Sequence, residues 1–421
     1  MKHRRHVRTI PQTRIPGEPT AARQALETAW YPRMTHDPRL ALLVTARGAR
    51  AEPVHRWLTF KQAFSPELVR RFLDEDDRLF GPVLDPFAGS GTTVVECARR
   101  SLPAIGIDPS EALNFVTRAK FARELPDPPD LTWAGPQSTW DALAEHLTHP
   151  VHRAALMCAV FSRYTSRGQL HSGAPLIVDA FSNIIELMRD DLRCPLPLAN
   201  TIELGDGRDL HTIADNSIAS IITSPPYLSR HDYRKLHDPL DVVYRHWYTT
   251  TDAPAPSTSP SAPRLPAHPG ADARTAGLLR PDVGSLPGTP QAPCSPTKRN
   301  HPRTTATRES PAVEEICAVL QNIDQRRLAR VVRTHFDGLF AALRECRRVL
   351  LPGAPCRLVI GGARWKDVYI PTDSILADFA VAIGLSVDRF DVARRLITAG
   401  RKFGRLTNVA PRESVLSLTK R

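Results

Sequence analysis

Two parts of the chain alternate between short apolar runs and longer amphipathic stretches. Short apolar runs bounded by turn residues are typical of buried strands, whereas apolar positions three and four apart indicate helices. Because strands and helices alternate, the pattern predicts an α/β fold with a parallel sheet and crossover helices. The expected strands are 83–85, 104–107, 201–206, 217–223, 356–360, 387–392 and 414–418. The expected helices are 66–73, 92–100, 111–123, 142–162, 177–190, 326–350 and 371–383.

The sequence between these stretches has a different composition. Residues 1–54 are basic and rich in Pro and Arg, and we expect a loose N-terminal arm with a helix near 20–30. Residues 124–200 interrupt the alternation with Pro-rich and then helical sequence. Residues 251–312 carry 13 of the 39 prolines, which predicts either a disordered insert or a loop that orders on binding. The chain therefore divides into 1–54, 55–123, 124–200, 201–250, 251–312 and 313–421.

The charge balance is strongly basic. The 56 Lys and Arg residues outnumber the 44 Asp and Glu residues, which gives a formal net charge of +12. A positive surface suits a polyanion such as nucleic acid, because phosphate contacts release counterions. Only 8 of the 56 basic residues are Lys, however, and a genome rich in G and C favours Arg, Ala and Pro whatever the function. Charge alone leaves both explanations open.

Other bulk features exclude several classes of protein. No run of about 18 apolar residues predicts a membrane span, and no apolar segment follows the basic N-terminus as in a secretory signal. The seven cysteines are scattered without a CxxC pair, which argues against a zinc site or a disulfide framework. We therefore expect a cytoplasmic protein with no metal.

A glycine-rich turn follows the first expected strand, in the sequence VLDPFAGSGTT at 83–93. Gly89 and Gly91 allow the backbone to pass close to a ligand. Asp108 ends the next strand, 23 residues after Asp85, where a carboxylate can accept hydrogen bonds from both ribose hydroxyls. Asp206 ends a later strand and is placed to meet an adenine amino group. The pattern predicts a nucleoside cofactor, and the alternative is a tight turn with two helix-capping aspartates.

A second string, IITSPPY at 221–227, is an apolar strand with a polar, aromatic tip. The Ser224 hydroxyl and the Pro225 carbonyl offer two hydrogen-bond acceptors, and the adjacent prolines stiffen the turn. An exocyclic amine needs such acceptors, because they allow its nitrogen to approach tetrahedral geometry. Tyr227 supplies a face on which a flat ring can stack. The alternative for this string alone is an ordinary Pro-rich turn.

Together these strings resemble amino-group DNA methyltransferases, which modify N4 of cytosine or N6 of adenine. DPFAGSGTT at 85–93 resembles their S-adenosylmethionine motif, and IGIDP at 105–109 resembles their ribose-binding motif. FSPEL at 64–68 resembles the segment near the methionine end of the cofactor, and SPPY at 224–227 matches their (S/D/N)-P-P-(Y/F/W) motif. The resemblance implies S-adenosylmethionine as the cofactor. The cofactor-binding candidates are Phe64, Asp85, Pro86, Phe87, Ala88, Gly89, Gly91, Thr92, Thr93, Asp108 and Asp206, and the catalytic candidates are Ser224, Pro225, Pro226 and Tyr227.

The resemblance also implies a fold. We expect a Rossmann-like domain with a seven-stranded, mostly parallel sheet, an antiparallel terminal strand, and helical and disordered inserts. Residues 55–123 are its cofactor-binding half, residues 201–250 its catalytic half, and residues 313–421 its remainder. Because the cofactor motif precedes the catalytic motif, the order is the non-permuted one, and added sequence must recognise the target. We expect the helical insert 124–200 to do so, since it can fold.

The implied activity is site-specific methylation of double-stranded DNA, of the kind found in restriction–modification. The methyl group passes directly to a flipped base, and Ser224 favours cytosine N4 over adenine N6. A covalent route to cytosine C5 needs a cysteine after the prolines, and position 227 is Tyr. Two alternatives stay open: an RNA methyltransferase acting on the guanine amino group, and a nucleic-acid-binding protein that has lost catalysis. Residues 229–235 either contact phosphates or form a solvated loop.

Overall fold

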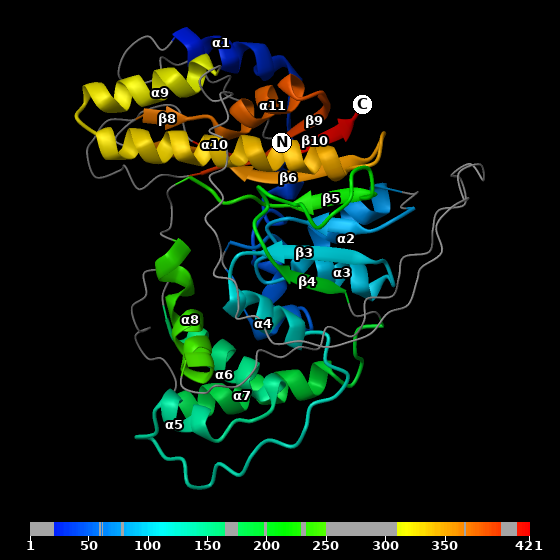
Figure 1. The fold of residues 1–421 in the computed structure, drawn as a ribbon, viewed down its shortest axis with the longest axis vertical. Coiled ribbons are helices and arrows are strands. Elements are labelled where there is room, and N and C mark those ends of the chain that lie inside the picture. The colour runs from blue at the N-terminus through cyan, green and yellow to red at the C-terminus, as the bar shows by residue number, and fades with distance from the viewer. Residues whose placement is uncertain are drawn as a thin grey trace, which may run out of the picture. The chain divides into compact units, whose positions relative to one another are not determined.

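The computed structural model describes residues 21–58, 60, 62–76, 80–164, 176–197, 200–228, 233–249, 310–365, 368–396 and 411–421. Within these ranges one large sheet has the strand order β1-β9-β10-β6-β5-β2-β3-β4, and a separate hairpin pairs β7 with β8 (Figure 1). The strands are β1 Met34–His36, β2 Val83–Asp85, β3 Ala104–Asp108, β4 Thr201–Leu204, β5 Ser220–Thr223, β6 Pro355–Gly361, β7 Ala363–Trp365, β8 Val368–Ile370, β9 Leu385–Arg395 and β10 Arg412–Lys420.

The large sheet is parallel except where β10 takes part. β10 runs antiparallel to both β6 and β9, and the other neighbouring strands pair in parallel. The predicted Rossmann-like sheet, mostly parallel with an antiparallel terminal strand, is confirmed. The predicted number of seven strands is too small by one, because Met34–His36 pairs in parallel with Phe390–Val392 as an additional edge strand.

Within the N-terminal arm 1–54, the expected helix near 20–30 is present as α1 (Ala21–Trp30). The expectation of a loose arm is wrong for residues 31–54, which form β1 and three short 3-10 helices, Tyr31–Arg33, Pro38–Leu40 and Gly48–Arg50. Arg23 is buried and donates from Nε to Glu315 Oε1 at 2.9 Å, and Glu27 accepts from Arg412. An Arg-rich composition suggests an exposed segment, but Arg23 and Glu27 form ion pairs with Glu315 and Arg412 from the far end of the chain. Residues 1–20 lie outside the described residues.

The expected helices are present, with one divided in two. Ser65 caps α2 by accepting from the Glu67 amide, as its position before Pro66 predicts. The expected helix 142–162 is two helices, because Pro150 lacks the N–H that would continue the first and instead begins the second. The remaining helices are α2 Pro66–Glu75, α3 Thr92–Arg99, α4 Glu111–Ala119, α5 Trp140–Glu145, α6 Pro150–Ser162, α7 Ile177–Asp191, α8 Tyr233–Thr249, α9 Pro311–Asn322, α10 Arg326–Val349, α11 Thr372–Ala382 and the 3-10 helix His55–Trp57.

Two of these helices were not expected from the sequence. α8 begins at Tyr233, inside the stretch interpreted as a phosphate-contacting or solvated loop. α9 begins at Pro311, capped by Ser310, so the Pro-rich segment ends before residue 310 rather than at 312. Residues 229–232 and 251–309 lie outside the described residues.

Apolar side chains cover both faces of the sheet. Neighbouring residues of β5 point to opposite faces, as strand geometry requires. Ile221 packs into a cluster with α10 and α11, and Ile222 packs into a cluster with α2 and α3. A third cluster joins α4 to α5–α8 and includes Trp57 and Phe60. The segment around residue 57 therefore connects the helical insert to the sheet domain.

Candidate active site

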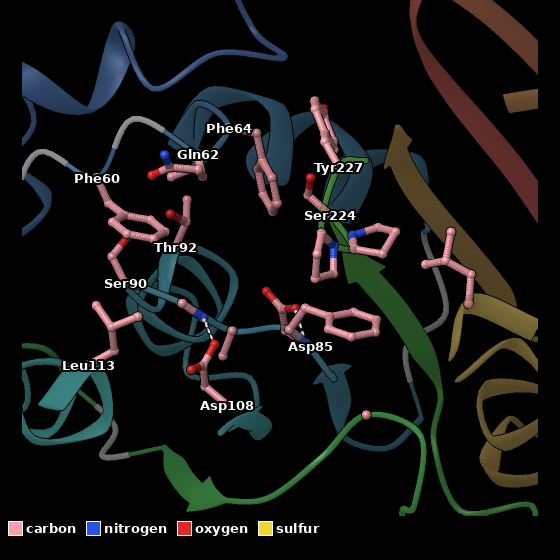
Figure 2. A pocket seen from close by; sticks show the side chains of 18 of the residues that line it. Phe60, Gln62, Phe64, Asp85, Ser90, Thr92, Asp108, Leu113, Ser224 and Tyr227 are labelled. Carbon is pink, nitrogen blue, oxygen red and sulfur yellow. Dashed lines mark hydrogen bonds between the residues drawn. The ribbon is translucent and has the colours of Figure 1, made fainter. Parts of the chain in front are cut away.

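A cavity of about 550 Å³ opens where β2, β3 and β5 end (Figure 2). Both predicted motifs line it, although they are more than a hundred residues apart in sequence. We call the residues Phe60, Phe64, Gly89 and Asp108 the glycine side, and Ser224, Tyr227, Arg394 and Glu413 the proline side. The sequence-predicted residues that line the cavity are Phe64, Asp85, Phe87, Ala88, Gly89, Thr92, Asp108, Asp206, Ser224, Pro225, Pro226 and Tyr227.

Backbone amides hold the Asp108 carboxylate against the glycine turn. Gly89 has φ +51°, in the left-handed region, and its amide donates to Asp108 Oδ2 at 2.9 Å. The Ser110 amide donates to Asp108 Oδ1, also at 2.9 Å. Burial raises the pKa of Asp108. Each carboxylate oxygen retains a further lone pair, so Asp108 can still accept from two hydroxyls of a ligand.

Asp85 connects the two motifs at the floor of the cavity. Thr223, which directly precedes Ser224, donates from its hydroxyl to Asp85 Oδ1 at 2.6 Å, and the Phe87 amide donates to the same oxygen at 3.1 Å. Burial raises the pKa of Asp85 to about 6. Figure 2 places Asp85 between Asp108 and Ser224. The carboxyl group therefore fixes the end of β2 against the end of β5.

Three predicted cofactor-binding residues do not line the cavity but shape its turn. Gly91 has φ +78°, and a Cβ there would lie 2.3 Å from Thr117 Cγ2. The Thr93 hydroxyl donates to the Ile222 carbonyl at 3.1 Å, which ties α3 to β5. The Pro86 carbonyl lies against Gly207, where a Cβ would approach it to 2.7 Å. The structure gives these residues packing roles, and ligand contact by them stays a prediction.

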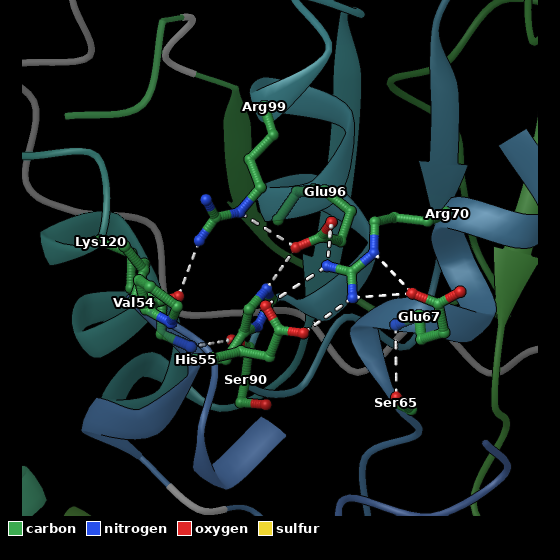
Figure 3. A network of polar contacts seen from close by, with 12 residues as sticks. Val54, His55, Ser65, Glu67, Arg70, Ser90, Glu96, Arg99 and Lys120 are labelled. Atoms are coloured by element: carbon green, nitrogen blue, oxygen red, sulfur yellow. Dashed lines mark hydrogen bonds and ion pairs between the residues drawn. The ribbon is translucent and has the colours of Figure 1, made fainter. Parts of the chain in front are cut away.

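A polar network centred on the buried pair His55 and Glu96 lies behind the glycine side (Figure 3). His55 Nε2 is 2.6 Å from Glu96 Oε1, and Arg70 and Arg99 also reach the Glu96 carboxylate, both at 3.2 Å. Burial opposes ionisation of Glu96, but the hydrogen bond from His55 and the two arginines outweigh it and lower its pKa. Burial lowers the pKa of His55, so a neutral ring donates from Nε2 to an ionised carboxylate. The network anchors the chain just before Phe60 and Phe64.

Next to this network the backbone is strained. Val54 has φ +68° and ψ −42°, a conformation that a β-branched residue rarely adopts. Asp191, at the end of α7, accepts from the Val54 amide at 2.6 Å and from Trp57 Nε1 at 2.7 Å. Arg56 completes the group with an ion pair to the same carboxylate. The helical insert therefore holds the segment that leads into the glycine side.

On the proline side, one carboxylate orients the aromatic ring. Pro225 is buried, while Ser224 and Tyr227 are half-buried at the mouth of β5. The Tyr227 hydroxyl donates to Glu413 Oε1 at 3.0 Å. Its ring lies against Gly361 of β6, where a Cβ would come within 2.5 Å of Tyr227 Cε2. Gly361 thus leaves the space that the ring occupies.

Other cavity residues carried little signal in the sequence. Glu413 and Arg394 come from β10 and β9. The one sequence feature that could have indicated them is an acidic residue inside the apolar pattern of the last strand.

His335 on α10 also lines the cavity. Burial lowers the pKa of His335 to about 4, and its Nε2 has no hydrogen-bond partner among the described residues. Asp206 is ion-paired with Arg208, so any contact with an adenine amino group is shared with that arginine.

Two kinds of feature are absent from the described part of the chain. No group of three or more His, Cys, Asp or Glu residues there is arranged to hold a metal ion. No helix in those ranges has the length and apolar character needed to cross a membrane.

Comparison with known proteins identifies relatives along almost the whole chain. The chain is 23% identical to the Type II methyltransferase M.AvaI of a Nostoc species, over 90% of each protein. It is 38% identical to the Type II methyltransferase M.MjaII of Methanocaldococcus jannaschii over 84 residues, 20% of this chain and 16% of that one. The predicted resemblance to this class, with S-adenosylmethionine as cofactor, is confirmed.

Two other comparisons add little. No family model matches the chain. Among solved structures, a SAM-dependent methyltransferase from Methanosarcina mazei aligns with a TM-score of 0.30 and 10% identity, over 83% of this chain and 96% of that one. A score this low supports no argument, so the fold rests on the strand order described above.

Proposed function

We propose that this chain methylates an exocyclic amino group of a base in double-stranded DNA, with N4 of cytosine favoured over N6 of adenine. One observation carries the proposal: the glycine turn with Asp108 and the tip Ser224–Tyr227 line the same cavity. The hydrogen bond of 2.6 Å between Thr223 and Asp85 joins them. The Type II methyltransferases to which the chain is similar support DNA as the substrate.

The glycine side suits a nucleoside cofactor. The cavity volume of about 550 Å³ lies within the usual range for ligand sites. Asp108 accepts the ribose hydroxyls, while the apolar side chains of Phe60 and Leu113 border the same space. Gly89 forms the turn beside that space with a φ of +51°, which L side chains rarely adopt, and a Cβ there would only touch the Phe60 ring, at 3.4 Å. When bound, S-adenosylmethionine supplies a methyl group on a positively charged sulfur.

The proline side suits the base that receives the methyl group. Ser224 Oγ and the Pro225 carbonyl accept hydrogen bonds from the amino group, which directs its lone pair toward the methyl carbon. The new N–C bond forms as the S–C bond breaks, and the surplus proton leaves the nitrogen along one of these hydrogen bonds to water. Tyr227 stacks on the flipped base, which offsets part of the cost of unstacking it.

We assign recognition of the DNA sequence to the insert 124–200. α5, α6 and α7 pack into their own apolar cluster with α4 and α8 and add no strand to the sheet. Trp133 of this insert is 45% exposed, an unusual state for a large aromatic side chain. Because this folded unit contributes no strand to the sheet, its surface is available for contacts with the target DNA.

The test is expression in a host that lacks DNA methylation, followed by modification-sensitive sequencing of its genome. We expect one kind of methylated base within one short site. A matched control is the double variant Ser224→Ala, Tyr227→Ala, which should bind the cofactor and leave the genome unmodified. Purified protein is also offered duplex DNA and RNA with labelled S-adenosylmethionine. Transfer to RNA alone replaces the DNA assignment, and cofactor binding without transfer to either identifies a protein that has lost catalysis.

A further inference from the structure

Arg394 and Tyr227 are held by the same carboxylate. Arg394 donates from Nε to Glu413 Oε2 at 2.5 Å, and the Tyr227 hydroxyl donates to Glu413 Oε1 at 3.0 Å. Glu413 is only 5% exposed, and all three residues line the cavity. The guanidinium group is therefore two hydrogen bonds away from the ring on which the base would stack.

An irregularity in the sheet puts Arg394 in this position. Glu413 pairs with Arg394, whereas the next residue, Ser414, pairs with Val392, so Ala393 is an extra residue in β9. A bulge of this kind re-aims the side chains on one strand and is common beside active sites. Here it accompanies an arginine that lies directly across from Glu413 and borders the cavity.

Arg394 has N–H donors that are not used by its bond to Glu413. Its Nε bonds to Glu413, and Nη1 and Nη2 have no partner among the residues that the structure describes. The side chain is 35% exposed, on the wall of the cavity. A guanidinium group is planar and presents its N–H groups in a fixed fork, which matches two acceptors lying side by side.

We propose that Arg394 reads the Watson–Crick edge of the target base by donating to N3 and O2 of cytosine, with Glu413 as its positioning residue. This inference rests on the proposed function and narrows it. Cytosine presents its N3 and O2 acceptors next to the amino group that Ser224 and Pro225 bind. Adenine presents N1 beside its amino group and then a C–H, so one donor of the fork would lose its partner. An unpaired buried donor is costly, and Arg394 therefore selects cytosine.

This contact holds the base and does not activate it. Hydrogen bonds to N3 and O2 withdraw electron density from the ring, which does not help the amino nitrogen to attack. Arg394 therefore contributes about equally to the ground state and the transition state, and its loss raises KM more than it lowers kcat. If Arg394 were merely structural, its loss would not affect KM more than kcat, and the change in KM would not depend on which atoms the base presents.

The experiment compares Arg394→Ala and Arg394→Lys with the wild type on two duplexes carrying the methylated site. One duplex has cytosine at the target position, and the other has 3-deazacytosine, in which a C–H replaces N3. On cytosine, Arg394→Ala should raise KM roughly 5- to 150-fold, the range for losing a bidentate base contact, and Arg394→Lys should fall between. On 3-deazacytosine, the same substitution should change KM much less.

Two controls isolate the contact. Arg389→Ala removes an ion-paired arginine from the same strand, where its partners are Glu75 and Asp391 and it does not line the cavity, and KM should stay unchanged. Cofactor affinity, measured by calorimetry, should be the same in all the variants and reports correct folding. If Arg394→Ala does not fold, Arg394→Lys tests the contact instead. Its KM should rise on the cytosine duplex and change much less on the 3-deazacytosine duplex.

The outcomes separate this inference from the proposed function. An equal change in KM on both duplexes, or none on either, overturns the role of Arg394 while leaving the methyltransferase activity in place. Methylation of adenine by the wild type overturns selection of cytosine and still supports amino-group methylation of DNA. Absence of transfer to any nucleic acid refutes the proposed function itself.

Discussion

The two sides of the cavity are held in place by different means. On the glycine side, backbone amides of Gly89 and Ser110 hold the Asp108 carboxylate, and a polar network centred on the buried Glu96 backs the neighbouring segment. On the proline side, Tyr227 is oriented by a side-chain hydrogen bond to Glu413 and by the absence of a side chain at Gly361. Two backbone amides hold the Asp108 carboxylate, one on each oxygen, whereas the Tyr227 hydroxyl is held by a bond to another side chain, which can adjust. The difference suits the two proposed ligands. The cofactor enters a preformed site, whereas the target base must first leave its DNA duplex.

The largest effect is expected on the glycine side, from Asp108→Ala. The change removes the acceptor for the Gly89 and Ser110 amides and for the ribose hydroxyls. Hydrogen bonds to a charged group contribute about 1.5–3 kcal/mol each, so Kd for S-adenosylmethionine should rise roughly 100-fold or more.

Calorimetric titration with the cofactor measures this effect. Asp388→Ala is the matched control, since Asp388 is exposed on β9 and bonds only to Ser386 and Thr419 among the described residues. An unchanged Kd for the Asp108 variant contradicts the assignment of the glycine side to the cofactor.

A second effect concerns the residue that joins the two sides. The pKa of Asp85 is about 6, above its ordinary value of 3.8, because of burial. Below about pH 4 the carboxyl is protonated in both the folded and the unfolded chain. Between pH 4 and 6 the Asp85 carboxyl loses its proton in the unfolded chain but keeps it in the folded protein. The free energy of unfolding therefore falls as the pH rises, by about 3 kcal/mol in total. Above that window the loss is constant.

Asp85→Asn should remove this dependence, because an amide does not titrate and still offers an oxygen to Thr223. Denaturation in urea from pH 4 to 7 measures the free energy of unfolding of both proteins. The wild type minus the variant should decline through this window, and a constant difference shows that Asp85 keeps an ordinary pKa.

The smallest effect is expected on the proline side, from Tyr227→Ala. Loss of stacking on the flipped base, about 1–3 kcal/mol, should lower kcat/KM roughly 5- to 150-fold without changing cofactor affinity. Tyr227→Phe keeps the ring and loses the hydroxyl that bonds to Glu413, so its effect should be smaller. Single-turnover methylation kinetics compare the two variants, and equal losses for both would mean that the hydroxyl rather than the ring matters.

The same contrast explains what the sequence could predict. The glycine turn 85–93 and the tip 224–227 each lie within one continuous string, where strand, turn and polar end determine their own geometry. Glu413 and Arg394 join the site only through the pairing of β9 with β10, and no local pattern specifies that pairing or its bulge. The edge strand β1 was missed for a related reason, since three residues without alternation become a strand only against β9.

The bond between Asp191 and the Val54 backbone bears on how such a protein can diversify. Asp191 ends α7 within the helical insert, yet it accepts from the strained turn that leads to Phe60 and Phe64. A different insert between residues 124 and 200 would have to reproduce the last turn of α7, or it would disturb the segment that leads to Phe60 and Phe64 as well as the target recognition proposed for the insert.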